Sequence, residues 1–339
     1  MSDEMSLLIG EEHGVLRLSS RDGGRTWSGP EPVLPNVEAH TVRGAPDGTV
    51  YAGTRGDGLF RSNDGGRDWE QVETPPELRN VRSLFISGDR FLVGTEPAGV
   101  YEWADGKRWL PVGDVQSCAG ASEWWYPVQG MDHHIRHLSI DPRHPERIFA
   151  AVQVGGVAIT PDNGDSWIDR RNLDLDVHMV EPHPTRAGTV YAGTGGKGLF
   201  RSVDDGETWE IISHGCGNFV VEFALDPRDP ARIYLGTGRG GVREWRENPA
   251  VGARGEVFRS DDGGQSWRKL RGGLPEQMQS RIDTLIVDAA EPSNVFIGAG
   301  GGRRNGAQDG GIFHSSDRGE SWNKIASVDD PLALCCVRG

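Results

Sequence analysis

The stretch Ser202-Val-Asp-Asp-Gly-Glu-Thr-Trp209 decides the fold, because its pattern Ser/Thr-x-Asp-x-Gly-x-x-Trp returns along almost the whole chain of 339 residues. Complete copies occupy residues 20–27, 62–69, 160–167, 202–209, 260–267 and 315–322. A decayed seventh copy occupies residues 103–109, with Asp105 at its centre. Repetition at a fixed period indicates a repeat architecture, in which each copy marks one structural unit.

Each residue type in the pattern suits a tight turn. The Asp carboxylate and the Ser or Thr hydroxyl accept hydrogen bonds from nearby backbone N–H groups, and Gly takes a positive-φ position without a Cβ clash. The Trp ring buries a large apolar area beside the turn and fastens a hairpin to the core. We therefore expect these turns to be structural rather than catalytic acids or calcium ligands.

The repeated pattern resembles the Asp-box, or BNR, repeat of the sialidase-type β-propellers, which also occurs in sortilin-like receptors, xyloglucanases and photosystem II assembly factors. The resemblance extends over nearly all of the chain. It implies an all-β, seven-bladed β-propeller with Asp-box turns. It does not identify the function, because propellers that share the repeat perform unrelated tasks.

Short strands are predicted around each box. Second strands are expected at 49–54, 189–194, 232–237 and 294–299, which are β-branched and aromatic runs that contain Gly near the end. First strands are expected at 81–86, 135–140, 177–180, 220–225 and 282–287. The N-terminal unit lacks a first strand, and residues 332–337 are predicted to supply it and close the ring.

Composition limits the other classes of protein. The formal net charge is −14 without any basic run, which argues against a nucleic-acid partner. Since there is no signal-like segment and no long apolar run, we expect no membrane association, a cytoplasmic location and a single domain over residues 1–339. Cys118, Cys216, Cys335 and Cys336 lack ligand-like spacing and are predicted to be reduced thiols. No nucleotide cofactor is expected, and the sequence does not indicate the oligomeric state.

The spacing of the boxes locates the insertions. Asp22 and Asp64 are 42 residues apart, which represents a bare unit, and longer intervals place extra residues at about 112–133, 239–255 and 300–311. A smaller insertion lies near 271–280. In the family architecture the box turns lie on one face and these insertions on the other. Long loops on a rigid scaffold commonly carry function, so we expect the site at this mouth of the ring.

Arginine, histidine and aromatic residues collect at the predicted mouth. Because a guanidinium binds a carboxylate bidentately, the arginines predict a small anionic ligand that carries a carboxylate. The predicted substrate-binding residues are Arg82, Arg136, Arg281, Arg239, Trp125 and Tyr126. Arg82, Arg136 and Arg281 begin three first strands and are expected to converge on one anion. Trp124 and Trp125 either cover the substrate or fold back onto the barrel, and both alternatives stay open.

Two functions remain open. The first is an intracellular hydrolase or lyase that acts on a small anionic substrate such as a sugar acid, with His134, His178, Glu222 and Asp283 as catalytic acids and bases. The second is a non-catalytic protein-binding or assembly scaffold, like the photosystem assembly factors. We favour the enzyme, because the long insertions are able to roof a pocket lined by titratable groups.

Two known activities of propellers with this repeat are disfavoured. The Phe/Tyr-Arg-Ile/Leu-Pro motif of the sialidases is absent, and Tyr126 is the one tyrosine predicted near the mouth. Xyloglucanases of this repeat type are much longer and contain two propellers, so a substrate groove of that kind is not expected.

His134, Asp176 and His178 form a candidate metal site. Ungapped alignment of the fourth and fifth units places His178 beside Arg136 and Asp176 beside His134, with His133 or His214 within reach. Imidazole and carboxylate ligands suit zinc, manganese or iron, and such a metal would activate water or polarise a substrate carboxylate. The alternative, in which these are ordinary core or surface histidines, stays open.

Overall fold

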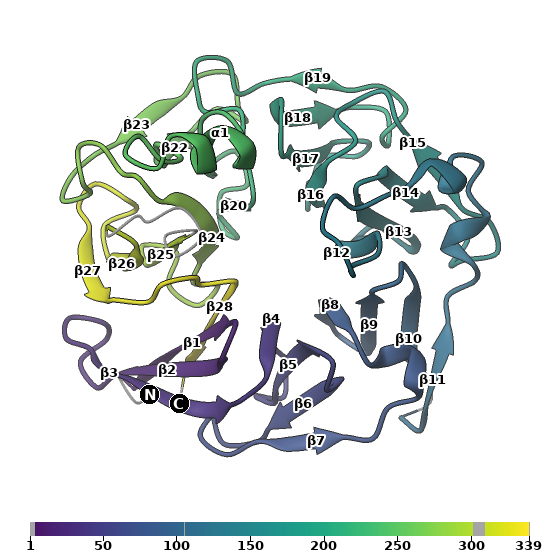
Figure 1. Ribbon diagram of the computed structural model, residues 1–339, viewed down its shortest axis with the longest axis horizontal. Helices are drawn as coiled ribbons and strands as arrows, with labels where there is room; N and C mark the ends of the chain where they lie inside the picture. Colours follow the sequence, from purple (N-terminus) through teal and green to yellow (C-terminus); the bar gives the residue numbers. More distant parts are fainter. Residues whose placement is uncertain (1–3, 105, 301–308, 339) are drawn as a thin grey trace.

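The computed structural model describes residues 4–104, 106–300 and 309–338, and in these ranges seven four-stranded antiparallel sheets form a ring (Figure 1). Each sheet is one blade, and its first strand lies next to the central axis. The predicted all-β, seven-bladed β-propeller is therefore confirmed.

In the two sentences below, the strands of each blade are named in order from the inner strand to the outer strand. Blades one to four contain β28 (Ala333–Arg338), β1 (Met5–Glu11), β2 (Gly14–Ser20) and β3 (Ser28–Pro35); β4 (Glu38–Gly44), β5 (Val50–Arg55), β6 (Leu59–Ser62) and β7 (Glu70–Val72); β8 (Val81–Ser87), β9 (Arg90–Thr95), β10 (Val100–Ala104) and β11 (Arg108–Pro111); β12 (His134–Asp141), β13 (His144–Gln153), β14 (Gly156–Thr160) and β15 (Ile168–Arg170). Blades five to seven contain β16 (Val177–Pro182), β17 (Val190–Thr194), β18 (Gly198–Ser202) and β19 (Glu210–Ile211); β20 (Phe223–Leu225), β21 (Ile233–Thr237), β22 (Glu256–Ser260) and β23 (Arg268–Leu270); β24 (Arg281–Val287), β25 (Val295–Gly300), β26 (Gly311–Ser315) and β27 (Asn323–Ala326).

Blade one is completed by the C-terminal strand. β28 pairs antiparallel with β1, from Met5 opposite Arg338 to Gly10 opposite Ala333. The predicted closure is confirmed, with its first residue one position later than expected. Because the ring is closed in this way, β1 has no free sheet edge.

The box turns are held by their own side chains, as blade five illustrates. Ser202 Oγ donates to Asp204 Oδ1 over 2.7 Å and accepts from the Gly206 N–H over 2.8 Å. Asp204 accepts from Thr208 Oγ1 and N, and these bonds, with that from Ser202, lower the pKa of Asp204 to about 2. The hydroxyl-to-carboxylate bond recurs at Asp22, Asp64, Asp162, Asp262 and Asp317. Asp105 of the decayed copy lies outside the described residues.

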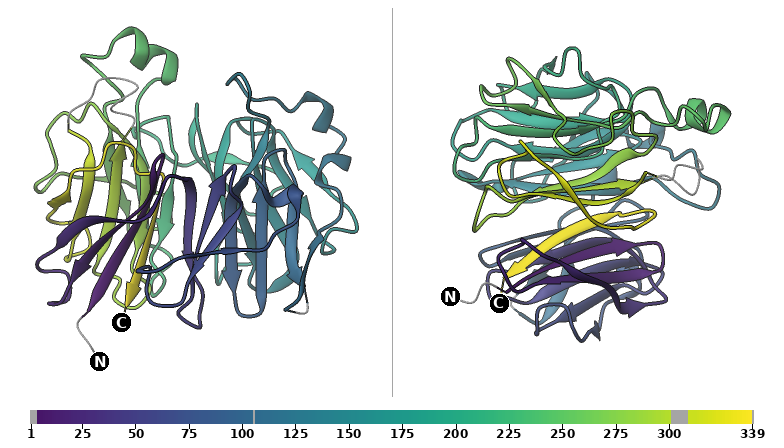
Figure 2. Two further views of the ribbon diagram at one scale, coloured as in Figure 1. Left: turned by 60° about the horizontal axis from the view of Figure 1, so that its bottom comes forward. Right: turned by 90° about the vertical axis from the view of Figure 1, so that its left-hand side faces the viewer.

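The boxes and the insertions lie on opposite faces. Met5 pairs with Ser20, so the first box lies at the end of the blade where the chain enters. Figure 2 shows that end on the face opposite α1 (Val242–Glu247), while residues 112–133, with η2 (Val115–Ser117) and η3 (Ala121–Glu123), rise from the same face as α1. Most of the insertion predicted at 300–311 lies outside the described residues. The face that carries α1 is called the mouth below.

One predicted first strand is much shorter than expected. β20 begins at Phe223 rather than at Val220, because the Val220 N–H bonds to Thr194 O of blade five and Phe219 bridges to Gly238. The remaining short helix, η1 (Pro76–Leu78), precedes β8. None of the helices in the described ranges has the length and apolar character to cross a bilayer. The four cysteines form no disulfide.

Candidate functional site

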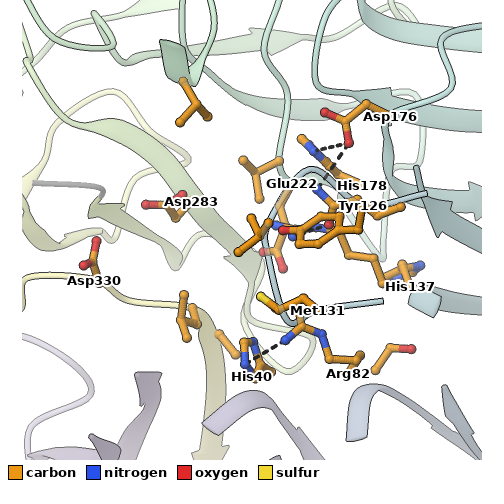
Figure 3. Close-up of a pocket in the computed structure, with 18 of the residues that line it drawn as sticks. His40, Arg82, Tyr126, Met131, His137, Asp176, His178, Glu222, Asp283 and Asp330 are labelled. Atoms are coloured by element: carbon orange, nitrogen blue, oxygen red, sulfur yellow. Dashed lines mark hydrogen bonds and ion pairs between the residues drawn. The ribbon is translucent and has the colours of Figure 1, made fainter. Parts of the chain in front are cut away.

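A cavity of about 810 Å³ opens at the mouth, around the axis of the ring. Its walls are the mouth ends of the inner strands, and its rim is formed by two insertions. Residues 124–133, called the mouth loop below, contribute Tyr126 and Met131, and α1 contributes Arg243 and Arg246. Figure 3 shows Asp176 and Glu222 on one side of this cavity and Asp283 and Asp330 on another.

A repeated backbone feature directs polar side chains into the cavity. In five blades the inner strand carries a register shift at the same step near its mouth end, which leaves one residue out of the ladder. Such a β-bulge turns a side chain away from the regular alternation of the strand. The five extra residues, all of which line the cavity, are His40, Arg82, Arg136, His178 and Asp283.

Asp176 and His178 form an ion pair on blade five. His178 Nδ1 lies 2.7 Å from Val220 O and Nε2 lies 3.2 Å from Asp176 Oδ1. Both of these oxygens are hydrogen-bond acceptors, so the His178 ring lies between two acceptors. Burial opposes ionisation of Asp176, but His178, Arg136 and the Gln153 amide outweigh it and lower the pKa of Asp176 to about 2.

Glu222 on blade six differs from Asp176, because its surroundings raise its pKa. It directly precedes β20, and its Oε2 accepts 2.8 Å bonds from Thr284 Oγ1 and from the Leu285 N–H of blade seven. Burial raises the pKa of Glu222, although Arg43 and these two bonds oppose the shift. Because Oε2 is engaged with donors, a proton held by this carboxyl would lie on Oε1. Two carboxyl groups with opposite preferences for the proton therefore face one cavity.

Arg281 and Asp283 form a contacting ion pair on blade seven. Burial disfavours the Arg281 cation, but Asp283 outweighs this effect and raises the pKa of Arg281. The guanidinium carbon lies 5.7 Å from the Phe219 ring centre and 5.6 Å from that of Trp245, distances at which cation–π attraction operates. Trp245 is the buried residue of α1, so this aromatic contact also fastens α1 to the ring.

Arg82 on blade three lies in a buried polar network. Its Nη1 lies 2.8 Å from His40 Nε2 and 3.6 Å from Glu96 Oε2, and its Nη2 lies 3.0 Å from His134 Nε2 (Figure 3). Burial is the main reason that the pKa of Arg82 falls to about 10, that of His40 to about 4 and that of His134 well below its usual value. Arg82 is therefore charged near neutral pH and both rings are neutral.

These contacts overturn the prediction that three arginines converge on one anion. Arg82 is occupied by Glu96 and two histidines, Arg136 donates to Gln153 over 2.8 Å, and Arg281 is paired with Asp283. Within the described residues, seven arginines line the cavity together with seven carboxylic acids, so its wall is balanced in charge. The acids are Glu12, Glu38, Asp176, Glu222, Glu247, Asp283 and Asp330.

Three other predicted residues lie outside the cavity lining. His134 has no exposed surface and supports Arg82 from behind. Arg239 is paired with Glu256 over 2.7 Å. Trp124 is buried against blade four, which is the second of the two alternatives, whereas Trp125 is 54 % exposed and does not line the cavity. Tyr126, in contrast, lines the cavity as predicted.

The candidate metal site is not assembled. Asp176 and His178 contact each other, but His134 faces Arg82 and the Asp132 carbonyl instead. In the described part of the chain, no group of three His, Cys, Asp or Glu residues has an arrangement able to hold a metal ion. The reason is that His134 and His178 each already have both ring nitrogens in contact with protein atoms.

Several lining residues were not among the predicted site residues. Glu38 Oε1 lies 2.8 Å from His40 Nε2, and Asp176 Oδ1 lies 3.2 Å from His178 Nε2, so in two blades an acid contacts the bulge histidine two residues after it. The spacing was a usable signal, since His40 and Arg82 are 42 residues apart and so are Arg136 and His178. The contributions of Met131, Arg243 and Arg246 depend on the paths of insertions, for which the repeat provides no template.

Comparison with known proteins confirms the resemblance to the Asp-box propellers and identifies enzymes to which the chain is similar. The family model Sortilin-Vps10, described as sortilin, neurotensin receptor 3, matches residues 197–331. A Paenibacillus xyloglucanase is 30 % identical over 154 residues, which are 42 % of this chain and 14 % of that protein. A probable oligoxyloglucan-reducing end-specific xyloglucanase of Neosartorya fischeri is 24 % identical over 293 residues, 81 % of this chain and 34 % of that protein. The chain thus spans between 14 % and 34 % of the length of these relatives.

Solved structures of two kinds share the fold. The GH74 enzyme of Niastella koreensis superposes with a TM-score of 0.64 at 16 % identity, covering 84 % of this chain and 45 % of that one. The protein YCF48 bound to D1 peptide superposes with a TM-score of 0.59 at 18 % identity, covering 92 % and 88 % of the two chains.

The predicted small anionic, carboxylate-bearing substrate is wrong. The relatives are xyloglucanases, whose names give a polysaccharide as the substrate, and none of the findings points to a lyase or a metal enzyme. As expected, these xyloglucanases are much longer than this chain. In physical terms, the arginines that suggested an anion already have partners in the protein.

Proposed function

We propose that this chain is a glycoside hydrolase that acts on a glycan of the xyloglucan type at the mouth cavity. The observation that carries the proposal is the pair of carboxyl groups on adjacent blades: Glu222, whose environment favours the proton, and Asp176, whose environment favours the charge. Glycosidases use such a pair, one as a proton donor and one as an anion. The equal numbers of arginines and acids in the wall, and the aromatic ring of Tyr126 on the rim, suit a neutral sugar chain.

The two groups have different roles in the proposed reaction. Glu222 gives its Oε1 proton to the glycosidic oxygen while the bond from that oxygen to the anomeric carbon breaks. Asp176, held as an anion by His178, faces the positive charge that develops on the sugar. A carboxylate with a pKa of about 2 is too weak a base to take a proton from water efficiently, so Asp176 acts as the nucleophile and water then releases the sugar. This assignment predicts that the product keeps the anomeric configuration of the substrate.

The test measures hydrolysis of xyloglucan oligosaccharides and of an aryl glucoside with a good leaving group. Glu222→Gln is expected to lower kcat on the oligosaccharide by about 10²–10⁴-fold but to retain far more activity on the aryl glucoside, whose departing phenolate needs no proton. Asp176→Asn is expected to abolish turnover of both substrates.

Glu181→Gln is the matched control for these variants. Glu181 lies on the inner strand β16 and burial raises its pKa to about 7, but it does not line the cavity. This variant should keep wild-type activity. Equal losses in the Glu181 and Glu222 variants, or no hydrolysis by the wild-type protein of any glycan in a broad panel, would contradict the proposal.

Non-catalytic capture of a protein segment is the second candidate. Two arginines of the cavity wall, Arg43 and Arg246, have no hydrogen bond or ion pair with the described residues and are free to bind an acidic peptide. The YCF48 complex holds a peptide on a propeller of similar length. Peptide binding that Arg43→Gln and Arg246→Gln abolish, together with the absence of glycan hydrolysis, would favour this function.

A further inference from the structure

The mouth loop crosses the cavity and is pinned at its start. The backbone of Trp125 exchanges hydrogen bonds with Val154 over 3.2 and 2.9 Å, and Trp124 packs into the core of blade four. Tyr126 and Met131 of the loop line the cavity, and the Gly130 carbonyl accepts a 3.3 Å hydrogen bond from Arg55 Nη2 of blade two. The loop therefore reaches from blade four to blade two.

Asp132 anchors the far end of the loop through its backbone. Its N–H donates to Glu96 Oε1 over 3.3 Å, and its carbonyl lies 3.1 Å from His134 Nδ1. Arg82 contacts both of these holding residues, since Nη1 faces Glu96 Oε2 and Nη2 donates to His134 Nε2. Because His134 accepts at Nε2, its hydrogen lies on Nδ1, which is the tautomer needed to donate to Asp132.

The same histidine supports the tyrosine ring. Tyr126 packs against His134 with 4.9 Å between ring centres and an angle of 72° between the planes. Arg82 is only 7 % exposed, and His40 of blade two holds its other nitrogen. Burying a charged arginine is costly unless it is bonded. Of the identified partners of Arg82, Glu96 and His134 hold the mouth loop, and His40 contacts the guanidinium from blade two.

We propose that Arg82 is a positioning residue that holds the mouth loop so that Tyr126 forms a stacking platform for a pyranose ring beside Glu222 and Asp176. This inference rests on the proposed glycosidase function. Arg82 does not bind the ligand in this arrangement; it fixes the tautomer of His134 and the place of Glu96, and through them the loop. The tyrosine contributes its ring to substrate binding rather than its hydroxyl to the reaction.

The first measurement is independent of any substrate. Hydrogen–deuterium exchange of peptides that cover residues 124–133 is compared among the wild type, Arg82→Met, Arg82→Lys and Arg17→Met. Arg17 is the matched control, because it is 6 % exposed, donates to Ser6 Oγ over 2.7 Å and does not line the cavity. Arg82→Met should speed exchange in the loop at least tenfold, Arg82→Lys should do so less, and Arg17→Met should leave the loop unchanged.

The second measurement uses oligoxyloglucan as the probe. Tyr126→Leu should weaken its binding about tenfold while Tyr126→Phe should bind as the wild type does, and Arg82→Met should raise KM about tenfold with less than a threefold change in kcat. Unchanged loop exchange in Arg82→Met overturns the positioning role, and unchanged binding by Tyr126→Leu overturns the platform. If the wild type binds no glycan, the proposed function and the platform both fail, whereas faster loop exchange in Arg82→Met would still uphold the positioning role of Arg82.

Discussion

The box turns and the mouth share one period but use it in opposite ways. At the box face each blade repeats the same residue types, and the Ser or Thr, the Asp and the Trp serve their own turn and the adjoining blades. At the mouth each blade repeats a position, the bulge, but fills it with His, Arg, Arg, His or Asp. Repetition of chemistry therefore marks structure in this ring, and repetition of position with changing chemistry marks the candidate site.

The difference between the box turns and the mouth has a physical cause. A box side chain bonds to backbone groups only a few residues away, so one solution works in every blade. A bulge residue is left out of the ladder, so its side chain is not tied to one local partner: Arg82 bonds to His40 and His134 of other blades, whereas Arg136 bonds to Gln153 of its own blade. The type of residue at each bulge is therefore free to differ from that in the next blade.

The largest expected difference between the two regions is their response to acid. At the mouth the folded-state pKa is about 4 for His40 and about 3 for His137, below the unfolded value near 6.5. The unfolded chain therefore takes up protons first, and stability falls as the pH drops from about 6.5 to 4, by as much as ~3 kcal/mol for His40. For the boxes the pKa of Asp204 is lowered to about 2, so the stability it contributes is lost only as the pH falls from about 4 to 2.

Urea unfolding at pH 7, 5.5, 4 and 3 measures this difference. His40→Gln should flatten the loss between pH 6.5 and 4, and Asp204→Asn should flatten only the loss below pH 4. A midpoint that stays constant down to pH 4 would mean that the mouth histidines are not held neutral. Since the pKa of Asp176 is about 2, we expect unfolding rather than titration of Asp176 to limit activity at low pH.

A smaller effect is expected from one hydroxyl of a box. Ser202 is 2 % exposed, and Ser202→Ala leaves the buried Gly206 N–H without its partner, which costs about 1–3 kcal/mol. Glycan affinity and turnover should not change, because the boxes lie on the face opposite the cavity. Denaturant unfolding and steady-state kinetics on the same sample check both statements. A box variant that keeps its stability but loses activity would reverse the roles of the two faces.

The smallest effects are expected from two mouth residues outside the cavity lining. Trp125→Ala and Arg239→Gln should each change stability by no more than about 0.5 kcal/mol and glycan affinity by less than twofold, because Trp125 is exposed and Arg239 pairs with Glu256 at a partly exposed position. Calorimetric titration beside Tyr126→Leu provides the contrast. A fivefold loss of affinity in either variant would place that residue in contact with the ligand.

The sequence contains most of the information about the fold. Six complete boxes, the β-branched strands and the missing first strand of the N-terminal unit together predict seven blades and the closing strand, and the structure has both. The exception is β20, which starts three residues late. Val220 bonds to Thr194 of the adjacent blade, and a contact between blades leaves no periodic trace in the sequence.

The site was predictable by position but not by chemistry. The sequence placed Arg82, Arg136, His178, Glu222, Asp283 and Tyr126 at the mouth, and all of them line the cavity. What it could not provide was their partners: Glu96 lies at the end of a second strand, and Gln153 is bonded to both Arg136 and Asp176. An arginine predicts an anionic ligand only if no carboxylate of the protein is already bound to it.

The pairing of β28 with β1 also bears on how the molecule is made. Because β1, β2 and β3 precede the other blades in the chain and β28 follows them, blade one lacks its inner strand until the other six blades have been synthesised. Until then, β1 presents a sheet edge on which strands of neighbouring nascent chains can pair. Arrival of the last strand therefore times the completion of the ring, and a polysome crowded with unfinished chains is where aggregation of this protein would begin.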